Sequence, residues 1–195
     1  MERLGADRAE QILAPLRELR PELDTFARVP TPALIRLHMD PEGPSPFVSD
    51  SAMLGSLPEA GVDAFLEAVG PDATTSLLLA ELRQLGGALA RPHEGGGVLS
   101  HLDGQYVTFA GAIAATPEMA EHGHADAVRL TESLAPWANG RQYLNFAETP
   151  VDVKSAYADG VWRQLAGIRS AVDPHGTFVA NHPVPRLHEE GCPRA

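Results

Sequence analysis

The sequence predicts an α+β fold, in which helices pack mainly on one face of an antiparallel sheet. Stretches whose apolar residues recur at helical spacing interleave with stretches that alternate apolar and polar residues. Such alternation is typical of strands with one buried face, an arrangement that is common in antiparallel sheets. Apolar residues make up 44% and charged residues 21% of the 195 residues, which suits one globular chain with its own hydrophobic core.

The first 46 residues predict two helices with a short strand between them. Residues 8–19 carry one apolar stripe of an amphipathic helix, which ends at Arg20-Pro21. Residues 25–29 predict a short strand, and residues 32–38 predict a short helix that begins in a proline pair. Residues 39–46 are a proline-rich loop.

Strand and helix signals alternate in the next part of the chain. Residues 47–54 predict a strand, and residues 58–69 predict a helix that Gly70-Pro71 ends. Residues 74–90 are the strongest strand candidate, although their Leu, Glu and Gln residues leave a helix open. The Gly86-Gly87 pair within them indicates a bulge or a close backbone approach.

A second strand and helix pair follows a long loop. Residues 91–104 are rich in glycine and histidine, and residues 106–114 alternate well enough to predict the next strand. Thr116 is a good helix cap and Pro117 suits the first helical position, so a helix is predicted up to about Leu134.

Residues 141–185 predict a strand, a loop, a helix and a tail. The sequence QYLNF at 142–146 mixes aromatic and polar positions in alternation and predicts a strand. Apolar residues recur at helical spacing from Val153 onward. The helix ends before Asp173-Pro174, because the residue before a proline is pushed out of the helical region. Gly176 then opens a turn into a proline-rich tail.

This order of features resembles the C-terminal segment of flavin-linked oxidases of the berberine bridge enzyme type. The family pattern is a Tyr-x-Asn strand, a helix that leads to Asp-Pro, a Phe, and an Asn before a final proline. The matching positions are Tyr143-Leu144-Asn145, Leu165 to Ile168, Asp173-Pro174, Phe178 and Asn181-His182-Pro183. The resemblance extends over most of the chain, including residues 37–44 and 81–92, and implies the substrate domain, whose sheet covers the flavin ring.

Nothing in the sequence matches the large FAD-binding domain of that family, with its glycine-rich segment and flavin-tethering histidine. We therefore expect the C-terminal portion of an oxidase. Residues 1–140 would be a substrate-binding α+β domain that lacks its first strand, residues 141–186 the berberine bridge-type segment, and residues 187–195 a flexible tail. FAD is implied as the cofactor. A separate FAD-binding chain or a second copy of this chain is expected to cover the sheet face left open to water.

The resemblance implies that Tyr143 is the catalytic residue, a base that lies beside the reactive edge of the flavin. A tyrosine base needs a pKa below its ordinary value near 10, and Arg141 is the neighbouring cation in the sequence. Asn145 is expected on the same side of the strand, where it binds the flavin or orients Tyr143. Asn181 falls where family members contact the cofactor. The structural alternatives are a half-buried core tyrosine, an asparagine that bonds the backbone, and a polar loop.

Three further residues are candidates for substrate binding. Tyr106 and Thr108 share one face of their predicted strand, opposite Val107 and Phe109. The polar pair would line the substrate cavity while the apolar pair meets the helices, and a solvated face is the alternative. Arg83 shares a face with Glu81, which fits substrate binding and an ion pair equally well.

Charge and composition exclude several classes of function. The net charge is −11, which argues against nucleic-acid or anionic-membrane binding and favours a small molecule or a protein as partner. Cys192 is the single cysteine, so neither an internal disulfide nor a thiolate metal site is expected. His122 and His124 would point apart on a helix, so no metal site is predicted. Without a signal sequence or a long apolar run, the expected location is the cytoplasm.

The leading hypothesis is the substrate-binding part of an FAD-dependent oxidoreductase that oxidises an alcohol, sugar or secondary metabolite, with oxygen as acceptor. Two alternatives stay open: a cofactor-free module that binds a ligand or another subunit, and a cofactor-free cyclase or isomerase that uses the same cavity.

Overall fold

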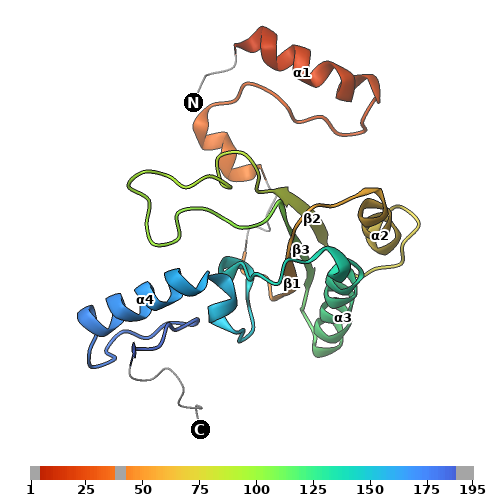
Figure 1. The fold of residues 1–195 in the computed structure, drawn as a ribbon. Coiled ribbons are helices and arrows are strands. Elements are labelled where there is room, and N and C mark those ends of the chain that lie inside the picture. The colour runs from red at the N-terminus through yellow and green to blue at the C-terminus, as the bar shows by residue number, and fades with distance from the viewer. Residues whose placement is uncertain (1–4, 38–42, 188–195) are drawn as a thin grey trace. The chain divides into compact units, whose positions relative to one another are not determined.

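The computed structural model describes residues 5–37 and 43–187 (Figure 1). Backbone contacts divide the chain into two compact units, residues 1–43 and residues 44–195. The second unit therefore contains both the predicted sheet and the predicted C-terminal segment.

The first unit consists of helix α1 (Ala6–Glu18) and the 3-10 helix η1 (Thr31–Arg36). Arg17 joins α1 to the chain that follows it, because its guanidinium donates to Asp24 Oδ2 at 2.8 Å and to Phe26 O at 3.1 Å. Both predicted helices are confirmed, although His38 lies outside the described residues. The strand predicted at 25–29 is wrong, because that segment pairs with no other described strand.

Three antiparallel strands form the sheet of the second unit (Figure 1). They are β1 (Phe47–Leu54), β2 (Leu79–Gln84) and β3 (Tyr106–Ile113), in the spatial order β1-β3-β2. This confirms the predicted α+β class and all three of these strands. Directly opposed residues share a face of the sheet. We call the face with Leu54, Tyr106 and Ala110 the helix face, and the face with Met53, Val107 and Phe109 the pocket face.

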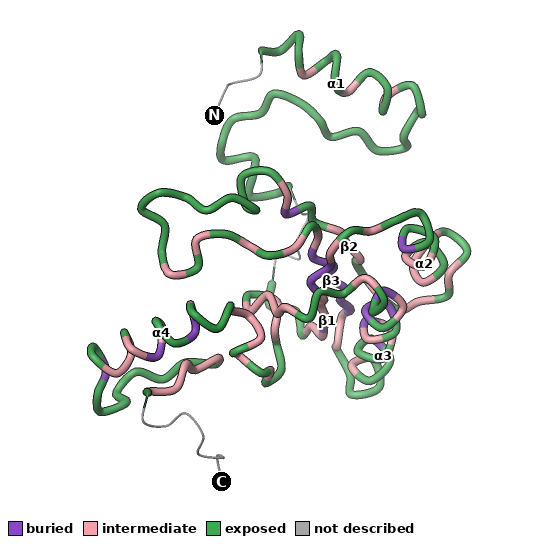
Figure 2. Tube along the Cα trace, in the orientation of Figure 1, coloured by how far each residue is buried: buried purple, intermediate pink, exposed green. Residues whose placement is uncertain are grey.

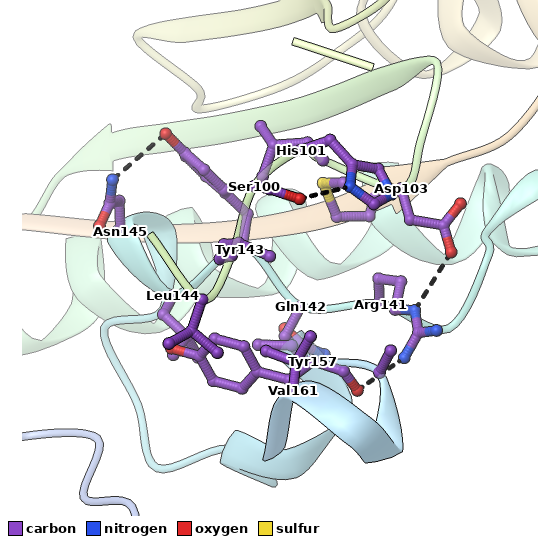
Figure 3. A pocket seen from close by; sticks show the side chains of 16 residues that line it. Ser100, His101, Asp103, Arg141, Gln142, Tyr143, Leu144, Asn145, Tyr157 and Val161 are labelled. Carbon is purple, nitrogen blue, oxygen red and sulfur yellow. Dashed lines mark hydrogen bonds and ion pairs between the residues drawn. The ribbon is translucent and has the colours of Figure 1, made fainter. Parts of the chain in front are cut away.

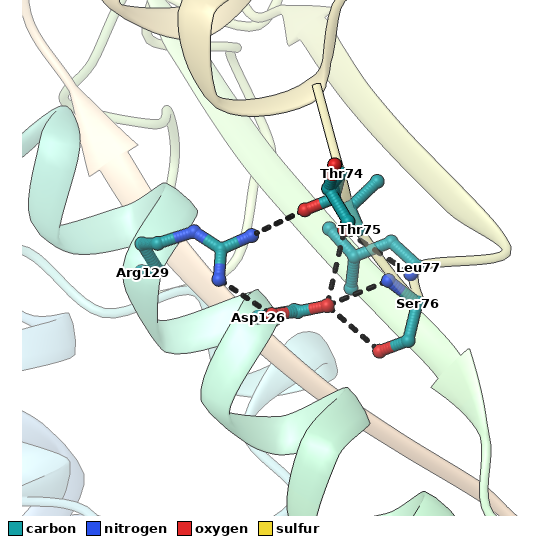
Figure 4. Close-up of polar contacts among 6 residues, drawn as sticks. All are labelled: Thr74, Thr75, Ser76, Leu77, Asp126 and Arg129. Atoms are coloured by element: carbon teal, nitrogen blue, oxygen red, sulfur yellow. Dashed lines mark hydrogen bonds and ion pairs between the residues drawn. The ribbon is translucent and has the colours of Figure 1, made fainter. Parts of the chain in front are cut away.

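β2 is much shorter than the predicted strand at 74–90. The residues before it are held by a carboxylate on helix α3 (Pro117–Ser133) (Figure 4). Asp126 Oδ2 accepts hydrogen bonds from the Ser76 N–H at 2.6 Å and the Ser76 hydroxyl at 2.8 Å, and Oδ1 accepts from Arg129 at 2.6 Å. After β2, Gly87 adopts a φ of +72° and turns the chain into the long loop.

Helices α2 (Glu59–Val69) and α3 cover the helix face, as the sequence predicts. Thr116 caps α3, since its hydroxyl accepts from the Met119 N–H at 3.2 Å. The core between α3 and the sheet contains apolar side chains with no exposed surface: Leu54, Ala110, Ala127, Leu130 and Leu134. Figure 2 shows this concentration of buried residues along the strands and α3.

The pocket face is covered by irregular chain. The 3-10 helix η3 (Leu144–Phe146) packs there, with Tyr143 and Phe146 against the buried side chains of Met53, Leu85 and Val107. The strand predicted at 142–146 is therefore wrong. A residue pair three apart, such as Tyr143 and Phe146, lies on one side of a 3-10 turn, and the two rings meet edge to face at 4.9 Å.

The predicted C-terminal helix is divided in two. A 3-10 turn, η4 (Val153–Ala156), precedes helix α4 (Asp159–Val172). α4 ends at Val172, before Asp173-Pro174 as expected, and the Asp173 carboxylate accepts from the Thr177 N–H at 2.7 Å, which holds the following turn. None of the described helices is both long and apolar enough to cross a membrane.

Candidate functional site

A pocket of about 220 Å³ opens beside the pocket face of the sheet (Figure 3). Residues 98–103 of the long loop, residues 141–145 and the start of α4 form its walls, and Met53 of β1 contributes from the sheet. The pocket therefore brings together segments that are about 40 residues apart in the sequence.

Tyr143 and Asn145 lie together at this pocket, as the sequence analysis predicts. The Asn145 amide Nδ2 donates to the Tyr143 hydroxyl at 3.2 Å. The phenol ring packs against Phe146, so its position is set by the apolar core of the pocket face. The pair lies where extended backbone at Tyr143 passes into the 3-10 turn η3, and not within a strand.

Arg141 lines the same pocket, but its guanidinium binds Tyr157 and Asp103. Arg141 Nη1 donates to Tyr157 O at 2.9 Å, and Arg141 Nε lies 3.5 Å from Asp103 Oδ2. Figure 3 shows this ion pair on the opposite side of the pocket from the Tyr143–Asn145 pair. The cation expected beside the phenol is thus bound to the loop and to residue 157.

Two polar loop residues lie at the pocket that the sequence does not connect with Tyr143: Ser100, and His101, which the sequence offers only as a member of an unsupported metal site with His93. The Ser100 hydroxyl lies 3.2 Å from His101 Nδ1, and both residues line the pocket. A loop rich in glycine gives no periodic signal, so nothing local in the sequence connects these residues with Tyr143. Among residues 5–37 and 43–187, no three acidic, histidine or cysteine side chains come together as a metal site.

The predicted orientation of the β3 side chains is inverted. Thr108 is fully buried on the helix face and its hydroxyl donates to Glu81 O at 3.2 Å, while Tyr106 packs against the helix-face core. Val107 and Phe109 lie on the pocket face instead. The register explains the inversion, because Tyr106 lies opposite Leu54, whose side chain is enclosed by α3. Neither Tyr106 nor Thr108 is among the residues that line the pocket.

Arg83 and Asn181 lie outside the pocket wall. Arg83 lies on the pocket face, where it pairs with Glu81 at 2.6 Å and covers the Phe146 ring at 4.9 Å. Asn181 is exposed, and the adjacent His182 Nε2 bonds Ala147 O at 2.9 Å, which brings the tail close to the end of η3.

The pocket face also carries a cluster of three aromatic rings. Phe47 and Phe109 stack with ring centroids 6.3 Å apart, and Phe109 lies 4.6 Å from Phe146. Beside them, the Ser49 hydroxyl is buried with no hydrogen-bond partner among the described residues. Aromatic rings suit contact with a planar ring system, because such rings pack against one another.

No family model and no curated protein matches the sequence. Among solved structures, Physcomitrella patens BBE-like 1 matches with a TM-score of 0.58 and 18% identity. The chain has the fold of part of a berberine bridge enzyme-like protein. The match covers 80% of this chain and 34% of the Physcomitrella protein, so the chain spans about a third of the length of that protein.

A single-residue variant of the same Physcomitrella protein gives the same TM-score, identity and coverage. At this identity the likeness concerns the fold alone. It agrees with the resemblance that the C-terminal motifs predict and with the predicted α+β class.

Proposed function

We propose that the chain is the substrate-side part of an FAD-dependent oxidoreductase that oxidises an alcohol, a sugar or a secondary metabolite, with oxygen as acceptor. The observation that carries the proposal is the Tyr143–Asn145 pair at a pocket beside the sheet, in a chain with the fold of part of a berberine bridge enzyme-like protein. FAD would be held by polypeptide outside these 195 residues, which would also cover the pocket face.

The residues fit contact with a flavin ring better than the binding of a whole dinucleotide. The pocket of about 220 Å³ is below the roughly 300–1,000 Å³ of pockets that enclose drug-sized ligands. No described helix begins at a glycine-rich turn of the kind that cradles a pyrophosphate. The aromatic rings of Phe47 and Phe109 are where a ring delivered by another segment would find contacts.

The bound FAD would accept a hydride from a substrate carbon. The task of this chain is to orient the substrate and to take the proton that leaves the substrate hydroxyl. Asn145 donates to the Tyr143 oxygen and so fixes the phenol while leaving that oxygen able to accept from a second donor. A substrate hydroxyl in that place would pass its proton to the Tyr143 side chain in its phenolate form, which becomes the neutral phenol as the hydride leaves the substrate carbon for the flavin.

The rest of the pocket wall divides into polar and apolar parts that suit a hydroxylated substrate. The Arg141–Asp103 ion pair and the His101 ring offer donors and acceptors for further hydroxyl groups. Leu144 and Val161 form apolar wall in the same pocket. Concave sites of this composition orient a ligand through a few polar contacts on an otherwise apolar surface.

The test is a fusion of this chain to the flavin-binding domain of a berberine bridge enzyme-like protein. Flavin absorbance is followed during anaerobic mixing with a panel of alcohols and sugars. We expect Tyr143→Phe to slow flavin reduction by about 100-fold or more, since a positioned base contributes about that much. The matched control is Tyr157→Phe, because Tyr157 lines the same pocket and its ring stacks on Trp162 at 6.0 Å. Equal rates for wild type and Tyr143→Phe would remove the assignment.

One observation favours a second candidate, a cofactor-free module that binds a small ligand. The sixteen residues of this chain that line the pocket include both hydrogen-bonding and apolar side chains. A fusion protein that keeps its flavin, fails to reduce it with any compound of the panel, and still binds one of them in the pocket would support this candidate.

A further inference from the structure

What we propose for the outer edge of β2 is independent of the proposed function of the pocket. β2 is the last strand in the order β1-β3-β2. It pairs inward with β3 in a register that places Arg83 opposite Val107, and Leu85 N–H continues this pairing by donating to Gln105 O at 2.8 Å. Hydrogen-bonding direction alternates along a strand, so Ala80, Leu82 and Gln84 turn their backbone N–H and C=O groups outward. Within the described residues, no backbone group bonds to that outward row.

The opposite edge of the sheet, formed by β1, is partly covered. At the end of β1, Gly55 N–H donates to Trp137 O at 2.9 Å and Asn139 N–H donates to Met53 O at 3.0 Å. These bonds form a bridge between Leu54 and Ala138. Residues 137–139 therefore cover part of the β1 edge, whereas the β2 edge stays open among the described residues.

The side chains of β2 make this open edge complementary to itself. Glu81 and Arg83 lie on the pocket face and form an ion pair at 2.6 Å, with Leu82 between them on the helix face. Charged residues on an edge strand commonly prevent pairing with other chains. Here, however, the two charges have opposite signs and lie symmetrically about Leu82.

We propose that two copies of the chain join their β2 strands in antiparallel fashion, about a two-fold axis that passes through Leu82. Leu82 then lies opposite Leu82 of the second copy, and each Glu81 lies opposite Arg83 of the other copy. The outward groups of Ala80 and Gln84 pair across the same interface, because they are equally distant from Leu82. The result is a continuous six-stranded sheet with the helices of both copies on one side.

Charge selects this register over its neighbours. A two-fold axis perpendicular to the sheet keeps the two helix faces on the same side. The remaining alternative registers are therefore those in which opposed side chains still lie on the same face of the sheet. An axis at Glu81 would place two carboxylates opposite each other, and an axis at Arg83 would oppose two guanidinium groups. Like charges directly opposite destabilise a strand pair, and opposite charges stabilise it. The Leu82 register also brings Leu79, 37% exposed, opposite Leu85 of the second copy.

The experiment is sedimentation equilibrium of the full chain over a range of concentrations. We expect a dimer for the wild type, and for Glu81→Arg and Arg83→Glu separately a dissociation constant raised roughly tenfold or more. Mixing these two variants should give a heterodimer, because their charges then complement each other. The double exchange of Glu81→Arg with Arg83→Glu should dimerise like the wild type.

A backbone variant tests the strand pairing independently of charge. Leu82→Pro removes the outward N–H at the axis, a change that edge strands tolerate, and we expect it to abolish the dimer while circular dichroism stays unchanged. A wild type that sediments as a monomer at every concentration would overturn the proposal. So would a dimer that the single charge reversals leave unaffected, since its interface would then lie elsewhere.

Discussion

The two faces of the sheet differ in how they are closed. On the helix face, α3 encloses apolar side chains with no exposed surface, and the polar groups beside them are paired, as with Thr131 and Asp50. On the pocket face, a smaller core around Met53 and Val107 lies under 3-10 turns and a long loop. Beside it are a pocket and a Ser49 hydroxyl that has no hydrogen-bond partner in the described part of the chain. Stability is thus concentrated on one face, while the other keeps the polar side chains and space that a site needs.

The largest expected effect is a difference in stability between a substitution in the helix-face core and one in the pocket-face core. Leu130 has no exposed surface, so Leu130→Ala should lower the free energy of unfolding by roughly 2–5 kcal/mol. Leu102 packs against the pocket-face core but is partly exposed, so Leu102→Ala should cost about 1–2 kcal/mol. Urea denaturation of both variants measures the difference. Equal costs would mean that the two faces contribute alike to stability.

The second effect tests how closely α3 approaches the sheet. A Cβ atom on Gly123 would lie 2.5 Å from the Ala112 Cβ, so Gly123→Ala should destabilise the fold by about 1–3 kcal/mol through overpacking. Gly167 on α4 has no atom within 4 Å of that position, so Gly167→Ala should be neutral or stabilise by up to about 1 kcal/mol. Thermal denaturation compares the two. A neutral Gly123→Ala would show that the helix face is loosely packed.

The third and smallest effect concerns the Asp126 carboxylate. Burial raises the pKa of Asp126, but hydrogen bonds from Ser76 and Arg129 outweigh that cost, so the net pKa is lowered below its usual 3.8. Such a group stabilises the fold above its unfolded pKa, and this contribution is lost as the pH falls through the folded pKa. Asp126→Asn should therefore cost about 1–2 kcal/mol at neutral pH, and its difference from the wild type should shrink below about pH 4.

Denaturation midpoints measured across this pH range check the prediction for Asp126. Asp159→Asn serves as the control, because the Asp159 side chain is 81% exposed and its ion pair with Lys154 is long, at 3.5 Å. A difference between wild type and Asp126→Asn that stays constant down to low pH would contradict the proposed role of the carboxylate.

The sequence predicted the helix face better than the pocket face, for a physical reason. The helices and strands that build the helix face have long periodic patterns, and α3 begins at its predicted cap, Thr116. The QYLNF stretch is too short to distinguish alternation from the three-residue spacing of a 3-10 turn. The proximity of Tyr143 and Asn145 was nevertheless predicted, because Tyr143 keeps the extended backbone that the alternating pattern indicates, with φ −103° and ψ 95°, and the turn begins only at Leu144.

The orientation of β3 and the pocket loop were beyond local sequence patterns. Tyr106 and Thr108 are polar, yet they lie on the helix face because the register with β1 is set by the burial of Leu54. Ser100 and His101 reach the pocket through a loop whose course depends on tertiary contacts. Strand register and loop course are properties of the whole fold, and a single strand or loop does not encode them.

The most direct test of the account is side-chain oxidation by hydroxyl radicals, compared between the free chain and the fusion that carries a flavin-binding domain. We predict that Phe47, Phe109 and Tyr143 on the pocket face become protected in the fusion protein. Leu66 and Met119, which are 52% and 41% exposed on α2 and α3, should be oxidised as before. Protection of Leu66 and Met119 with unchanged oxidation of Tyr143 would contradict the assignment of the site to the pocket face.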